Sequence, residues 1–156
     1  MKLKTLLLSL LLSTSFIGTT YADYDDGMLA YAKKDYKTAI KEFQPLAEQG
    51  NKDAQFRLGY IYSQGQGVLK DYKKAVKWFG KAAEQDHTSS QYILGLMYGK
   101  GEGVLKDERE EFKWHSRAAE LGDAGAQNSL GMMYEFGTGV LKDYKEAVKW
   151  YRKAAE

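Results

Sequence analysis

Glu111 and His115 are the two side chains whose types and spacing best fit acid–base chemistry in this chain. They stand four residues apart, so on a helix they would be neighbours. In the repeating pattern described below, the same two positions otherwise hold alanine (Ala39, Ala75, Ala147) and an aromatic residue (Phe43, Phe79, Tyr151). Two interpretations follow. The pair is a polar or pH-sensitive site, or it is a mutual compensation in which a glutamate at a tight helix crossing is satisfied by the adjacent imidazole or by Arg117.

Other catalytic and cofactor-binding constellations are missing from the sequence. The chain has no cysteine and two histidines, so the usual metal-ligand clusters cannot be assembled. Residues 95–100 resemble a phosphate loop, but one residue is missing between the glycines and Gly101 replaces the required Ser or Thr. The chain contains neither a nucleophile elbow nor the serine motifs of β-lactam enzymes. We therefore expect no enzymatic activity, no cofactor and no metal.

The elements that must position these residues come from a block that is written three times at an interval of 36 residues. Leu-Gly-x-x-Tyr begins at Leu58 and recurs 36 and 72 residues later, and each copy is followed by Gly-x-Gly-Val-Leu-Lys-Asp. A period in this range is typical of solenoids, in which stacked units bury faces that one unit cannot bury alone. The sequence predicts an all-α, α/α superhelical solenoid of about four helix pairs, with units at about 23–50, 51–86, 87–122 and 123–156.

Each complete unit is predicted to contain two helices, because apolar residues recur at spacings of three and four. Gly65 should end the first helix and Asp71 should cap the second, and Val68 and Leu69 are expected to turn back toward the core. The first unit lacks four residues of this interhelical loop. The first helices are expected at 52–64, 88–100 and 124–136, and the second helices at 71–85, 107–121 and 143–156.

Two further repeated positions are assigned to packing. Gly59 and its equivalents Gly95 and Gly131 lie inside a helix, where glycine costs about 1 kcal/mol relative to alanine. We expect them to permit close approach of the second helix, with Ala75 and Ala147 facing them. The tryptophan series Trp78, Trp114 and Trp150 is predicted to lie in the core.

The N-terminal 22 residues have the features of a secretory signal peptide. Lys2 and Lys4 precede an apolar stretch, and small residues precede a predicted cleavage after Ala22. Removing the two lysines from 23 basic residues leaves 21 against 21 acidic residues, so the mature chain 23–156 is near neutral. This balance argues against a nucleic-acid partner. We expect a periplasmic or secreted protein with no stable membrane insertion after cleavage.

The run Leu-Gly-x-x-Tyr, Gly-x-Gly-Val and Asp-Tyr-Lys-x-Ala-Val-Lys-Trp resembles the Sel-one-like repeat, a relative of the tetratricopeptide repeat. The resemblance covers essentially all of residues 23–156. It implies a superhelix whose first helices line a concave face, and an adaptor function that holds other proteins. Exported bacterial members are linked to envelope assembly, signalling and host contact. Some disulfide-rich members are described as β-lactam-binding or hydrolysing, and this chain departs from them by lacking cysteine.

Candidate binding residues are the first-helix positions that differ between units. Residues needed for stacking should resemble one another, whereas residues facing a partner are free to differ. This differing stripe is unusually apolar for a solvent-exposed surface, as binding faces tend to be. For Tyr60, Leu96 and Met132, packing between units is an equal alternative. The candidate protein- or peptide-binding residues are Phe56, Tyr60, Gln64, Tyr92, Leu96, Lys100, Asn128, Met132 and Phe136.

Two further expectations concern the ends of the units. A self-associating scaffold is the alternative to an adaptor, because the last unit has no polar capping helix after it and this end is a candidate homodimer interface. His87 follows Asp86 between two units and is expected to be solvated.

Overall fold

The computed structural model describes residues 19–156, which form eight α-helices and no strand. The predicted signal peptide lies mostly outside the described residues. Helix α2 begins at Thr19 and runs across the predicted cleavage position, and the cleavage itself stays a prediction. Within this part of the chain, no helix has the length and apolar character needed to span a membrane. The helices are α2 Thr19–Ala32, α3 Tyr36–Glu48, α4 Lys52–Gln64, α5 Tyr72–Ala83, α6 Thr88–Lys100, α7 Glu108–Glu120, α8 Ala124–Phe136 and α9 Tyr144–Ala155.

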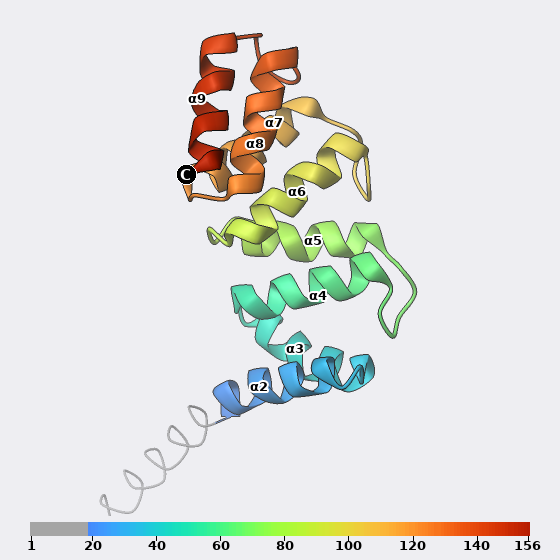
Figure 1. Ribbon diagram of the computed structural model, residues 1–156. Coiled ribbons are helices and arrows are strands. Elements are labelled where there is room, and N and C mark those ends of the chain that lie inside the picture. The colour runs from blue at the N-terminus through green and yellow to red at the C-terminus, as the bar shows by residue number, and fades with distance from the viewer. Residues whose placement is uncertain (1–18) are drawn as a thin grey trace, which may run out of the picture.

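The helices pair and stack in chain order, from α2 at one end to α9 at the other (Figure 1). The principal contacts are between consecutive helices, so the core extends along the stack. The all-α solenoid is therefore confirmed. The first helices occupy the predicted residues, whereas the second helices begin one residue later than predicted and end one or two residues earlier. The loop between α2 and α3 spans 33–35 against 65–71 in the next unit, which confirms the four missing residues.

The helix ends follow from the repeated loop residues. Gly65 adopts the left-handed conformation at the end of α4, with φ 69°. Asp71 has an extended backbone and its carboxylate accepts a hydrogen bond from the Lys74 amide at 2.9 Å, so it is the N-cap of α5 and not its first residue. Asp107 and Asp143 cap α7 and α9 in the same way.

A buried glutamine side chain forms a hydrogen bond between each of these units and the unit before it. Gln91 Nε2 donates to the backbone oxygen of Ala83 at 3.0 Å, and both residues are buried. The equivalent bonds join Gln55 to Ala47 at 2.9 Å and Gln127 to Ala119 at 3.2 Å. A carbonyl near the end of each second helix would otherwise be buried without a partner, at a cost of about 1–3 kcal/mol. The recurrence of this glutamine therefore follows from the stacking of units.

The in-helix glycines do permit close approach, but their facing residues differ from the prediction. A Cβ atom on Gly59 would lie 2.7 Å from the Phe79 ring. Gly131 stands in the same relation to Tyr151, at 2.5 Å, and Gly95 to His115, at 2.8 Å. The expectation that Ala75 and Ala147 face the glycines was wrong, because the ring one turn further along the second helix fills this space.

The loop leucines were also predicted wrongly. Val68 is partly buried against the first core cluster, whereas 92% of the Leu69 surface is exposed. Leu105 and Leu141 are exposed to a similar degree. Gly65 and Gly67 turn the chain with positive φ, and in the loop that follows only the valine packs against the core while the leucine is exposed to solvent.

Candidate functional site

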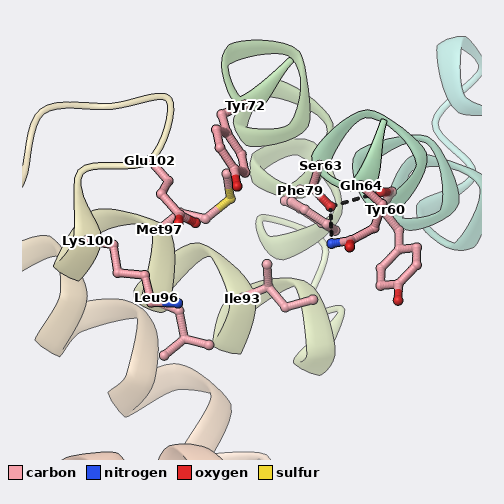
Figure 2. A pocket seen from close by; sticks show the side chains of 10 residues that line it. All are labelled: Tyr60, Ser63, Gln64, Tyr72, Phe79, Ile93, Leu96, Met97, Lys100 and Glu102. Carbon is pink, nitrogen blue, oxygen red and sulfur yellow. Dashed lines mark hydrogen bonds between the residues drawn. The ribbon is translucent and has the colours of Figure 1, made fainter. Parts of the chain in front are cut away.

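The first-helix face is the surface formed along α4, α6 and α8 by the side chains that differ between units. The structure places the nine predicted binding residues differently along it. Tyr60, Gln64, Leu96 and Lys100 come together around one groove, whereas the other five do not line it. The groove lies between α4 and α6 and has a volume of about 290 Å³ (Figure 2).

The groove has an apolar floor and a polar end. Phe79 of α5 and Met97 of α6 are buried at its base, and Ile93 lines the α6 side. At the polar end, Gln64 Nε2 donates to Ser63 Oγ at 3.3 Å, and the Ser63 hydroxyl donates to the Tyr60 backbone oxygen at 2.8 Å. Figure 2 shows Lys100 and Glu102 on the α6 side of this space. The groove is thus suited to one apolar side chain with polar contacts at its edge.

Three linked positions beneath this face change together from unit to unit. The second unit has Ser63, Ala75 and Phe79 at these positions, and all three are buried. In the third unit, the carboxylate carbon of Glu111 lies 2.5 Å from where a Cβ atom on Gly99 would stand. Glycine at position 99 therefore provides the space into which the glutamate fits. Arg117, which was one of the two groups predicted to satisfy the Glu111 carboxylate, instead lies over the Trp114 ring, 5.0 Å from its centroid.

His115 is fully buried, and neither ring nitrogen has a hydrogen-bond partner among the described residues. Its Nε2 lies 4.0 Å from Glu111 Oε1, which is too long for a hydrogen bond. Burial lowers the pKa of His115 to about 4, and the Asp123 carboxylate opposes that shift. Burial also raises the pKa of Glu111, with a smaller contribution from Glu108. At neutral pH the imidazole is uncharged and acts mainly as a core ring, 5.4 Å from the Tyr92 ring.

In the fourth unit, the residues at the positions equivalent to Gly99 and His115 form a hydrogen bond. The Tyr151 hydroxyl donates to Glu135 Oε2 at 2.6 Å. This bond raises the pKa of Tyr151 to about 12, because the neutral phenol is the donor. Ala147 is buried at the position that Glu111 occupies in the third unit. The acidic side chain therefore comes from the second helix in the third unit, as Glu111, and from the first helix in the fourth unit, as Glu135.

Phe56 and His87 form a stacked pair at the start of the face. Their ring centroids are 4.6 Å apart and their planes differ by 26°. His87 is the N-cap of α6, since its Nδ1 accepts from the Ser90 amide at 3.2 Å. Burial lowers its pKa, and its Nε2 lies 3.5 Å from Asp53 Oδ1. The expectation that His87 is solvated was wrong, because capping and stacking hold the ring against α4.

The remaining predicted residues divide between packing and exposure. Tyr92 is partly buried against the core cluster of the third and fourth units. Asn128, Met132 and Phe136 are exposed on α8, and Phe136 exposes 69% of its surface. The apolar α8 side chains therefore continue the first-helix face beyond the groove.

Arg57 belongs to the same face and was not among the predicted residues. Its guanidinium carbon lies 5.9 Å from the Tyr31 ring centroid and 5.7 Å from that of Phe56. Its Nε atom is buried without a hydrogen-bond partner, and among the side chains of residues 24–156 no carboxylate lies within 4.0 Å of the guanidinium. Its position in the differing stripe was the signal that could have identified it, since the equivalent residues are Ile93 and Ser129.

Among the described residues, no group of three or more His, Cys, Asp or Glu side chains is placed to hold a metal ion. Glu111 and His115 are the closest approach to acid–base chemistry, and the imidazole is closed off from solvent.

Comparison with known families agrees with this architecture. The Sel1 repeat model matches residues 52–87, 88–123 and 124–156. The chain belongs to the Sel1 repeat family. Sel1 repeat proteins are typically non-enzymatic scaffolds that mediate protein–protein interaction. A search of the curated proteins gives no match.

Solved structures of Sel1 repeat proteins are similar to this chain. A Sel1 repeat protein from Oxalobacter formigenes is 40% identical over 85% of this chain and 54% of its own, with a TM-score of 0.81. A protective antigen of uropathogenic Escherichia coli is 38% identical over 95% of this chain and 32% of its own, with a TM-score of 0.83. Cysteine-rich protein B of Helicobacter pylori is 29% identical over 79% of this chain and 88% of its own, with a TM-score of 0.61. This chain thus spans about half and about a third of the first two structures.

Proposed function

We propose that this Sel1 repeat protein is an exported adaptor that binds a protein or peptide on its first-helix face, in envelope assembly, signalling or host interaction. The observation that carries the proposal is the groove between α4 and α6, where Tyr60 and Leu96 border an apolar floor. A rigid solenoid can present such a groove without reorganisation, which reduces the entropy lost on binding. The similarity to a protective antigen of uropathogenic Escherichia coli supports the host-interaction part of this proposal.

A crosslinking pull-down from envelope and culture-supernatant fractions tests this proposal. The parent protein is compared with a Tyr60→Ser, Leu96→Lys variant, and with Leu121→Lys, which changes an exposed leucine at the end of α7. Tyr92 is left unchanged, since its ring packs against His115. We expect a partner that the parent and Leu121→Lys retain and the groove variant loses. Equal retention by all three, with equal helicity, would refute binding at the groove.

Export is proposed from the N-terminal sequence features, with cleavage after Ala22 and a periplasmic or secreted product. Expression of the complete sequence in a bacterium, followed by fractionation and intact-mass measurement, tests it. The expected product begins at Asp23 and leaves the cytoplasm. A product of uncut mass retained in the membrane fraction would contradict the proposal.

A self-associating scaffold is the second candidate function, and the exposed surface of α9 favours it. Ala147 is the one buried residue of α9, whereas α5 also buries Trp78, Phe79 and two further alanines. Tyr144 and Val148 are exposed. Light scattering over a hundredfold range of concentration tests association. We expect a Val148→Lys substitution to abolish any concentration-dependent increase in mass, and a constant monomer mass would exclude the scaffold.

A further inference from the structure

We infer that the partner is an acidic peptide segment in which a carboxylate binds Arg57 and a nearby apolar side chain enters the groove between α4 and α6. The inference rests on the proposed function and names the chemistry of the ligand. It depends on one unpaired cation and on its place beside the groove.

Arg57 is held in position but is not neutralised. The rings of Tyr31 and Phe56 both lie close to the guanidinium, with centroids 5.9 and 5.7 Å from its carbon. The Tyr31 ring is itself fixed, since its hydroxyl donates to Gln66 Oε1 at 2.9 Å. Aromatic neighbours stabilise a guanidinium and restrict its rotamers, yet they leave its outer N–H donors available. The half-buried cation is thus preorganised for an anion.

The side chains of residues 24–156 do not supply that anion within 4.0 Å. Asp53 stands one turn before Arg57 on α4, the spacing at which an aspartate and an arginine often pair. Its carboxylate instead lies 3.5 Å from His87 Nε2, and no contact within 4.0 Å joins it to Arg57. The Arg57 Nε atom is buried without a hydrogen bond, a cost that the fold bears and that a ligand carboxylate would offset through the neighbouring donors.

The apolar part of the ligand follows from what lies next to Arg57. The Phe56 ring is 6.4 Å from the Tyr60 ring and 5.9 Å from the Phe79 ring, and the last two residues line the groove. Arg57, Phe56 and Tyr60 therefore form one continuous surface that leads into it. At the far end Lys100 and Glu102 bring one charge of each sign, so the uncompensated positive charge is at the Arg57 end. An acidic residue next to a leucine-sized side chain matches both features.

Peptide titrations followed by amide chemical shifts test this inference on protein purified from cells expressing the complete sequence. Three acetylated, amidated peptides serve as probes, with the central sequences Glu-Glu-Leu, Gln-Gln-Leu and Glu-Glu-Ser between glycines. We expect Glu-Glu-Leu to shift amides of α4 and α6 and to bind at least tenfold more tightly than either of the others at low salt. The Arg57→Leu variant should bind Glu-Glu-Leu no better than Gln-Gln-Leu, and Arg57→Lys should fall between.

Arg109→Leu is the matched control, because Arg109 is exposed at the start of α7 and the change in net charge is the same. It should alter the affinity for Glu-Glu-Leu by less than twofold, and dispersed amide spectra confirm that each variant is folded. Equal binding of Glu-Glu-Leu and Gln-Gln-Leu in the groove would overturn the role of Arg57 and leave the proposed groove function standing. Equal binding of Glu-Glu-Ser would overturn the apolar anchor. Failure of all three peptides to shift groove amides would overturn this inference and weigh against the groove itself.

Discussion

Acidification should destabilise this protein through His115 more than through any exposed group. The pKa of the buried imidazole falls to about 4, from 6.5 for a free histidine. The unfolded chain therefore binds a proton between pH 6.5 and pH 4 that the folded chain does not, so stability is lost as the pH falls through this window. At about 1.4 kcal/mol for each pKa unit, the loss attributable to His115 is about 3 kcal/mol.

Replacement with the residue found in the second unit isolates this contribution. His115→Phe places there the ring that Phe79 provides opposite Gly59, so the helix crossing is preserved. It also removes two buried nitrogens that have no partner, and we expect the variant to be at least as stable as the parent at pH 7. Between pH 7 and pH 4, the difference in unfolding free energy between variant and parent should grow by about 3 kcal/mol.

Urea denaturation followed by circular dichroism at pH 7.0, 5.5 and 4.0 measures the difference. Subtracting the two proteins cancels the groups that they share, including His87, whose pKa is also lowered by burial. Glu111 acts in the opposite direction, because a raised carboxyl pKa favours the folded state at lower pH. The triple change Gly99→Ser, Glu111→Ala, His115→Phe reproduces the second-unit set and removes both groups. Parallel stability curves for His115→Phe and the parent would refute the reasoning.

Three further predictions concern packing between helices and between units. Gly59→Ala should destabilise the protein by about 1–2 kcal/mol, because the added Cβ would lie 2.7 Å from the Phe79 ring and overpacking outweighs the gain in helix propensity. Gly80→Ala is its counterpart: nothing lies within 4 Å of the added atom in α5, so thermal unfolding should show a gain of about 0.5–1 kcal/mol. Gln91→Ala should cost about 1–3 kcal/mol in urea denaturation, since the buried Ala83 carbonyl loses its donor. A Gly59→Ala protein as stable as the parent, or a neutral Gln91→Ala, would contradict the packing account.

The sequence predicts the fold in detail because helix periodicity and the loop glycines are local signals. The ends of α4, α6 and α8 follow from apolar spacing and from left-handed glycines such as Gly65, and the start of α5 follows from its cap Asp71. Which residue faces Gly59 depends instead on how far one helix is displaced along another. That quantity is set by packing, and the periodic pattern is compatible with either Ala75 or Phe79.

The candidate site was only partly predictable for the same reason. The differing stripe contains the groove residues Tyr60 and Leu96, and comparison between units is enough to find them. The position of Arg57 beside an aromatic ring depends on Tyr31 of the first unit, and the shortened loop of that unit prevents its register from being derived from sequence. His87 has a cap role that the sequence pattern does not suggest, since Asn51 and Asp123 hold the equivalent position in the neighbouring units.

Site-specific photo-crosslinking in living cells tests the central claim most directly. A photoreactive phenylalanine analogue is placed at Leu96 in the groove, at Phe136 on α8, and at Tyr144 at the start of α9 as the control. The account predicts a discrete protein adduct from Leu96 and Phe136 that is absent from Tyr144 and is lost in an Arg57→Leu background at the groove position. Adducts from Tyr144 alone would show that the first-helix face is not where this Sel1 repeat protein meets its partner.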